Sequence, residues 1–159
     1  MIILTSFKES VNLLKHSGLS DANVYSVARF QPEGFNYINL PFFAAQDADG
    51  NKLRLRGRKD PLNDYRKDLW KYYKSVWPDI REWVDALDNK SIDMLCCWCP
   101  HASHSKDQMR IYGNFVCHTG LIGRLISSLR RNIDIYMDND HSVHLVEEYK
   151  PLTFKQLVL

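Results

Sequence analysis

The stretch Ile92-Asp93-Met94-Leu95-Cys96-Cys97-Trp98-Cys99-Pro100 decides the fold, because an apolar run that ends at a proline is typical of a buried strand. A polar segment, 102–114, follows it. Cys117-His118-Thr119-Gly120 then leads into a helix predicted over 121–131, where apolar residues recur at steps of three and four. All four cysteines lie between residues 91 and 131, with three of the six histidines. The stretch therefore predicts a strand, a turn and a helix with a functional site where they meet.

Outward from this stretch, strands and helices alternate. Further strands are predicted over 1–4, 24–28, 35–40, 133–137 and 143–146. A helix capped by Ser6 should bury Phe7, Val11 and Leu14, and two more helices should begin at Asp60-Pro61 and at Pro78. This alternation predicts one α/β domain over residues 1–159, with three layers, a Rossmann-like organisation and a mainly parallel sheet.

The length and composition fit a globular protein in the cytoplasm. A chain of 159 residues, 45% hydrophobic and 25% charged, is long enough to bury a core. No apolar run approaches the roughly 18–20 residues of a membrane span, and the apolar start is too short for a signal peptide. We therefore expect no membrane partner. Clustered cysteines in a cytoplasmic chain are more often reactive or metal-binding than disulfide-bonded.

Candidate ligand-binding residues follow the predicted strands. They are Thr5, Ser6, Arg29, Cys97 and Cys99, together with Thr119 and Gly120 in the turn before the last helix. Because ligands of parallel α/β sheets bind beyond the carboxyl ends of the strands, we expect these residues to converge at one edge. No cofactor is predicted.

Cys117 and His118 are the candidate catalytic residues. Free amides and the dipole at a helix start favour a thiolate or a bound anion, so Cys117 could act as nucleophile with His118 as its acid–base partner. The turn partly resembles the phosphatase and rhodanese cradle, but Arg124 stands one position too late for that chemistry. The alternative is that Cys117 is a buried small side chain and Gly120 a tight turn.

A zinc site is a second interpretation of the cysteines. Cys96 and Cys99 have the spacing of a zinc-binding pair, but Cys117 and His118 are adjacent, and a strand sends Cys96 and Cys97 to opposite faces. The candidate ligands in this interpretation are Cys96, Cys97, Cys99, His101, His104, Cys117 and His118. The alternative for His101 and His104 is that they are solvated loop residues. No metal ligand is assigned on this basis.

The positive charge is concentrated between Lys52 and Lys74, a segment that contains nine Lys or Arg residues and three Asp residues. Lys67, Lys71 and Lys74 are predicted to lie on the solvated face of a helix whose apolar stripe includes Tyr72. Three arginines on the preceding loop are equally compatible with ligand binding and with solvation. They are Arg54, Arg56 and Arg58.

Two sets of motifs carry a family resemblance. Thr5-Ser6 and Arg29-Phe30-Gln31-Pro32 resemble the early motifs of DUF488-like α/β proteins, with Val27 where that family has an acid. Cys96-Cys97-Trp98-Cys99-Pro100 and Cys117-His118-Thr119-Gly120 resemble the late signature of DUF4326-like proteins. The long segment between these two motifs and the residue Thr119 depart from that signature. The compact chain with its insertion also resembles bacteriophage proteins, which would place it in the host cytoplasm.

Three functions remain open at this level. The first is binding of a nucleotide or nucleic-acid-derived anion at the strand ends, with Arg29, Arg124 and the loop arginines as cations and Cys117-dependent group transfer or hydrolysis as its catalytic form. The second is a non-catalytic viral binder that captures a host signalling nucleotide or inhibits a host defence protein. The third is a zinc-stabilised module that binds single-stranded nucleic acid.

Overall fold

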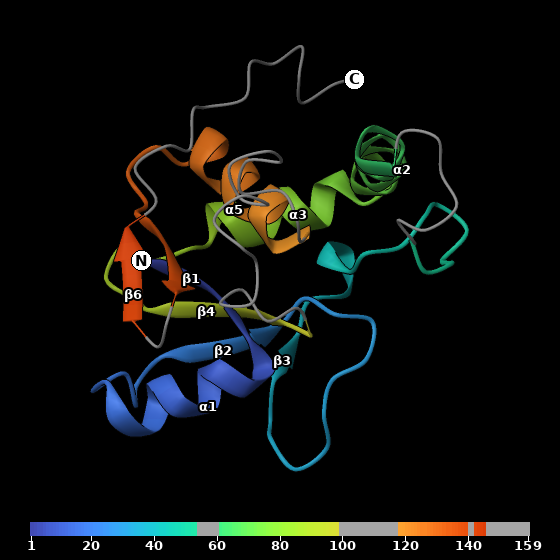
Figure 1. Ribbon diagram of the computed structural model, residues 1–159. Coiled ribbons are helices and arrows are strands. Elements are labelled where there is room, and N and C mark those ends of the chain that lie inside the picture. Colours follow the sequence, from blue (N-terminus) through green and yellow to red (C-terminus); the bar gives the residue numbers. More distant parts are fainter. Residues whose placement is uncertain (54–60, 99–117, 140–141, 146–159) are drawn as a thin grey trace.

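The computed structural model describes residues 1–53, 61–98, 118–139 and 142–145, with the backbone alone for 61–63, 138–139 and 142–145. Its centre is a six-stranded sheet in the order β3-β2-β4-β1-β5-β6 (Figure 1). The strands are β1 (Ile2–Ser6), β2 (Asn23–Ser26), β3 (Ile38–Asn39), β4 (Asp93–Cys97), β5 (Ile135–Asn139) and β6 (Ser142–Leu145). All neighbours pair in parallel except β5 and β6, which are antiparallel. The prediction of an α/β fold with a mainly parallel sheet is confirmed.

Helices cover both faces of the sheet, which gives three layers (Figure 1). One face carries α1 (Phe7–His16); the other carries α2 (Pro61–Ser75), α3 (Trp77–Asp85) and α5 (His118–Leu129). A short 3-10 helix, η1 (Pro41–Phe43), lies between β3 and α2. The layering follows from the strand order, because right-handed crossovers running in opposite directions along a sheet put their helices on opposite faces.

Strands β1 and β4 form the centre of the core. Every residue of both strands is buried, as expected for strands covered by helices on both faces. Ile2, Leu4 and Leu95 pack into the cluster shared with α3 and α5. Ile3 and Met94 pack into the cluster on the α1 side. This alternation fixes which way each side chain points as the two strands reach their carboxyl ends.

The first helix begins where the sequence predicted and buries a different stripe. Ser6 is the N-cap, and its hydroxyl accepts the Glu9 backbone N–H at 3.1 Å. The predicted face of Phe7, Val11 and Leu14 is wrong in part, because Phe7, Ser10 and Leu13 are the deeply buried positions. Ser10 tolerates this burial because its hydroxyl donates to the Phe7 carbonyl at 2.8 Å.

Other element boundaries moved by a few residues. The extended piece predicted over 35–40 contains only the two-residue strand β3. Helix α5 begins at His118 rather than at 121. The strand predicted over 133–137 is β5, which begins at Ile135 and extends to Asn139. In each case pairing or packing with distant parts of the chain sets the boundary, which local patterns do not record.

The aromatic residues of α2 belong to the core. Trp70, Tyr72 and Tyr73 are buried, whereas Lys67, Lys71 and Lys74 are exposed, as predicted for the solvated face. The hydroxyl groups of Tyr72 and Tyr73 donate to the carbonyls of Pro41 and Phe43, at 2.8 Å and 3.3 Å. These rings are therefore unavailable for stacking on a nucleic acid.

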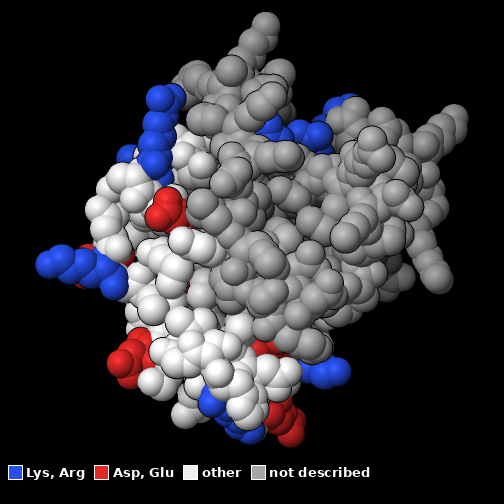
Figure 2. Space-filling view, turned by 60° about the vertical axis from the view of Figure 1, so that its left-hand side comes forward, with Lys and Arg blue, Asp and Glu red and all other residues white. Residues whose placement is uncertain are grey.

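Acidic and basic side chains are interspersed over the described part of the face shown in Figure 2. Within the described residues, no helix combines the length and the apolar character needed to cross a membrane.

Candidate functional site

The candidate site lies at the carboxyl ends of β1 and β4. The two strands are neighbours, and Ser6 at the end of β1 pairs with Cys97 at the end of β4. The chain leaves β1 into α1 on one face, whereas the helix between β4 and β5, α5, lies on the other face (Figure 1). Such a divergence is the topological switch point at which open α/β sheets bind ligands. Both helices also begin at this edge, so their free amides and dipoles favour negative charge there.

His118 joins the start of α5 to the end of β2. Its Nε2 lies 2.8 Å from the carbonyl oxygen of Val27, and the ring is buried. A carbonyl oxygen can only accept, so Nε2 carries a proton and donates it in this contact. The Val27 N–H in turn donates to the Cys96 carbonyl at 3.0 Å. These two contacts hold the ends of β2, β4 and α5 together.

A row of small polar side chains crosses the sheet beneath α1. Thr5 and Ser26 both pair with Cys96, so the three side chains lie on the same face of the sheet. This is the α1 face, onto which Met94 also points, two residues before Cys96. Ser26 accepts the Ala28 N–H at 3.4 Å. The Thr5 side chain is fully buried, and its Oγ1 has no hydrogen-bond partner within the part of the chain that the structure describes. A buried hydroxyl left in this state costs free energy, so Thr5 marks a place where a ligand could supply the missing partner.

Tyr37 lies over the same row. Its hydroxyl group is 3.4 Å from the Phe7 carbonyl, to which it donates. Burial raises the pKa of Tyr37 above its ordinary value, and the Ser10 hydroxyl partly opposes this shift. The phenol therefore stays neutral and keeps its proton for the contact with the first turn of α1.

Arg29 supplies an exposed cation at this edge. It follows the end of β2, and its Cζ lies 5.5 Å from the centre of the Phe30 ring, a cation–π distance. Its charge also contributes to the low pKa of the Asp47 carboxyl, although backbone N–H donation from Asn51 contributes more. The guanidinium is therefore an exposed cation beside the Phe30 ring at the rim.

The structure brings together several of the residues that the sequence singled out. Ser6 and Cys97 pair at the switch point, and Thr5 lies one residue earlier in β1, on the α1 face of the sheet. His118, Thr119 and Gly120 are buried in the first turn of α5. Arg124 lies two turns into the helix, about 9 Å along the axis from His118, and is half-buried. The remaining predicted site residues lie outside the described residues. These are Cys99, Cys117, Arg54, Arg56 and Arg58.

The two described cysteines point to opposite faces of the sheet. Cys96 packs into the cluster beneath α1 and Cys97 into the cluster beneath α5. One metal ion cannot be bound by both thiols from these positions. Within the described ranges, no group of three His, Cys, Asp or Glu side chains is arranged to hold a metal.

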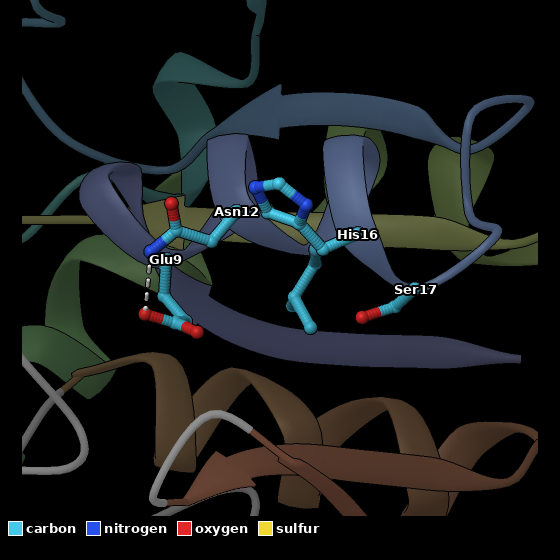
Figure 3. Close-up of a pocket in the computed structure, with 5 residues that line it drawn as sticks. Glu9, Asn12, His16 and Ser17 are labelled. Carbon is cyan, nitrogen blue, oxygen red and sulfur yellow. Dashed lines mark hydrogen bonds between the residues drawn. The ribbon is translucent and has the colours of Figure 1, made fainter.

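A separate hollow of about 220 Å³ runs along α1. Figure 3 shows Glu9, Asn12, His16 and Ser17 gathered along one flank of the helix, and Leu13 completes the lining. The Asn12 amide donates to Glu9 Oε2 at 3.3 Å. The hollow extends from the first turn of α1 to its C-cap, so it leads away from the carboxyl edge of the sheet.

Sequence reasoning missed two aromatic residues at the edge. Trp98 directly follows β4 and Phe30 follows Arg29, and both are largely exposed. The Trp98 Nε1 donates to the Phe30 carbonyl at 2.7 Å. The signal in the sequence is position alone: each is a large aromatic residue just beyond the end of a predicted strand.

No family model, no curated protein and no solved structure matches the chain. The resemblance to DUF488-like and DUF4326-like proteins therefore remains a prediction based on the motif residues. The chemistry of the site is interpreted from its geometry.

Proposed function

We propose that this protein binds a small phosphate-bearing ligand, a nucleotide or a nucleic-acid-derived anion, at the carboxyl ends of β1, β2 and β4. The observation that carries this proposal is the switch point: Ser6 and Cys97 pair at the ends of adjacent strands, and helices on opposite faces both begin there. Amide groups from two helix starts converge on one edge, which suits a dianionic phosphate better than a neutral group.

Two side chains add to this support. Thr5 offers a buried hydroxyl that makes no hydrogen bond within the described residues, and it can donate to a phosphate oxygen or accept from a ligand hydroxyl. Arg29 offers an exposed guanidinium at the rim. Guanidinium groups match phosphate oxygens in charge and in geometry, because two N–H groups can donate side by side.

Catalysis is the second part of the proposal. Cys117 precedes His118, the first residue of α5, and a thiolate at that position could act as a nucleophile on a bound nucleotide. The His118 ring lies next to Cys117 in the chain and is anchored through Nε2 to the Val27 carbonyl, and an imidazole at this position could act as the acid–base partner of the thiol. A protein that binds the same ligand without turnover needs Thr5 and Arg29 and does not need a reactive thiol.

Calorimetric titration with ribose 5-phosphate and with 5′-nucleotides tests the binding part. We expect binding by the wild-type protein, weaker binding by Thr5→Val and Arg29→Gln, and weaker binding at higher salt. Arg131→Gln is a matched control, because Arg131 is also exposed and lies beyond the far end of α5. An affinity that responds equally to Arg29→Gln and Arg131→Gln would place the phosphate elsewhere.

Thiol reactivity separates the enzyme from the binder. Cys96 and Cys97 are buried, so the folded protein should react slowly at these two positions. A Cys117 that alkylates faster than a free peptide thiol at pH 7, with turnover lost in Cys117→Ser and ligand binding kept, supports the enzyme. Ordinary reactivity at Cys117 with unchanged ligand binding supports the binder.

A further inference from the structure

Two large aromatic side chains are exposed to solvent at the carboxyl edge of the sheet. The Phe30 side chain is 73% exposed and Trp98 is 59% exposed. Elsewhere in the described residues, Ile38 in β3 is the other large apolar side chain with comparable exposure. Neighbouring exposed aromatic rings are uncommon on a surface that has no binding role.

We call these two residues the aromatic platform, and specific contacts fix the Trp98 ring. The Trp98 Nε1 donates to the backbone carbonyl of Phe30 at 2.7 Å and thereby joins positions 68 residues apart. The Trp98 ring also meets the Phe7 ring edge to face, with centroids 5.1 Å apart and planes at 72°. Phe7 is buried, and its ring packs against that of Tyr37, with centroids 4.8 Å apart. The Trp98 ring is therefore preorganised, so that binding a second ring against it costs little side-chain entropy.

The platform adjoins the proposed anion site. Trp98 directly follows Cys97, which pairs with Ser6, and Phe7 is the first residue of α1. Arg29 lies over the Phe30 ring, 5.5 Å from its centre. A ligand whose phosphate sits at the helix starts would thus present its other end to Trp98 and Phe30.

We propose that the aromatic platform stacks the base of a single nucleotide. This inference rests on the proposed function and names the ligand class of the same site. A nucleobase is planar and apolar on its faces, so exposed rings fixed at their edges suit it, and a guanidinium beside them can stack on the base or contact its phosphate.

Among the described residues, the number of exposed rings favours one nucleotide over a strand. Binding of single-stranded nucleic acid uses successive aromatic rings, one for each stacked base. In the described residues, the aromatic rings of α2 that could have extended such a row are buried, namely Trp70, Tyr72 and Tyr73. Phe30 and Trp98 provide a surface for one base.

Titration calorimetry with seven ligands tests this inference: the four nucleoside 5′-monophosphates, ribose 5-phosphate, adenosine, and a thymidine oligonucleotide of twelve residues. The wild-type protein should bind at least one mononucleotide about 5- to 150-fold more tightly than ribose 5-phosphate. Trp98→Ala should abolish this difference and leave the affinity for ribose 5-phosphate unchanged. Trp98→Phe keeps a ring and should retain part of the difference. Ile38→Ala, which removes an equally exposed apolar side chain from β3, should change nothing.

The outcomes separate this inference from the proposed function. Equal affinities for mononucleotides and ribose 5-phosphate in the wild-type protein would overturn the base site and leave the anion site standing. Binding of adenosine that depends on Trp98, without any binding of ribose 5-phosphate, would keep the base site and overturn the anion site. Binding of neither probe would overturn both. An oligonucleotide that binds through Trp98 more tightly than any mononucleotide would overturn the choice of a single nucleotide.

Discussion

The imidazole of His118 contacts the carbonyl of Val27 at 2.8 Å, and this contact joins the first residue of α5 to the residue that follows β2, 91 positions away in the chain. Between them lies the end of β4, whose Cys96 carbonyl accepts the Val27 N–H. One side chain therefore positions a helix start, with its free amides, over the carboxyl edge of the sheet. The same contact requires a proton on Nε2 and fixes the orientation of the ring.

Loss of this contact should destabilise the protein. His118→Ala leaves the Val27 carbonyl buried without its donor, so we expect the free energy of unfolding to fall by about 1–3 kcal/mol. His118→Gln can place an amide N–H near the same oxygen and should recover part of the loss. Urea denaturation followed by circular dichroism measures both variants. Equal stability of His118→Ala and the wild-type protein would contradict the assigned hydrogen bond.

Removal of the Thr5 hydroxyl should instead stabilise the protein. Its Oγ1 is buried and makes no hydrogen bond in the described part of the chain. Thr5→Val replaces the hydroxyl with a methyl group of similar size, so the free energy of unfolding should rise by about 1–3 kcal/mol while ligand affinity falls. Thr5→Ser keeps the hydroxyl and loses a buried methyl group, so it should be less stable than the wild-type protein and still bind. A destabilised Thr5→Val would mean that the folded chain satisfies this hydroxyl.

Much of the fold could be predicted because its signals are local. The apolar run of β4, the Ser6 cap and the Pro61 start of α2 each depend on residues within a few positions of one another. Opposite faces for Cys96 and Cys97 followed from the period of a strand alone. The convergence of Ser6, Cys97 and His118 at one edge followed from the general rule for parallel sheets, once the strands were assigned.

Two features escaped prediction for different physical reasons. Ser10 is polar, so a hydropathy pattern assigns it to solvent, yet its hydroxyl is satisfied locally by the Phe7 carbonyl three residues earlier and the residue is buried. The aromatic platform forms because Trp98 reaches the carbonyl of a residue 68 positions away. That contact has no sequence signature, since it depends on where the strand ends meet in space.

Acid should weaken the turn that follows η1. The Asp47 carboxylate accepts the backbone N–H groups of Asp49 and Asn51 at 3.0 Å and 2.8 Å. These bonds, those of Asn51 first, lower the pKa of Asp47 below its ordinary value of 3.8. A lowered pKa means that the folded state prefers the carboxylate over the protonated acid. The stabilisation by Asp47 is therefore complete above pH 3.8, the ordinary pKa, and is lost as the pH falls through the lower pKa that Asp47 has in the folded state.

Carbon-detected NMR titration of the Asp47 carboxyl group measures this shift directly. We expect a midpoint below 3.8 in the wild-type protein. Asn51→Ala removes the side-chain donor and keeps the backbone donor, so its midpoint should rise only part of the way. The stability difference between the wild-type protein and Asp47→Ala should shrink as the pH is lowered through this range. A midpoint at or above 3.8 would show that the turn does not hold the carboxylate in solution.

Arg130 and Arg131 are adjacent in the chain, but we expect their substitution to have different effects on the free energy of unfolding. The Arg130 guanidinium donates to the carbonyls of Val84 and Asp85, both at 3.1 Å, and to that of Leu87 at 3.3 Å. These carbonyls close the end of α3, where a cation also complements the helix dipole. Arg131 is exposed.

We therefore expect Arg130→Met to lower the free energy of unfolding by about 1 kcal/mol, because carbonyls that are only partly buried lose a charged donor. Arg131→Met should change it by less than about 0.5 kcal/mol. Arg130→Lys should resemble Arg130→Met more than the wild-type protein, since a single ammonium cannot reach carbonyls on several sides as the planar guanidinium does. Thermal unfolding of the three variants measures these differences. Equal effects at positions 130 and 131 would mean that the contacts between the end of α5 and the end of α3 do not stabilise the fold.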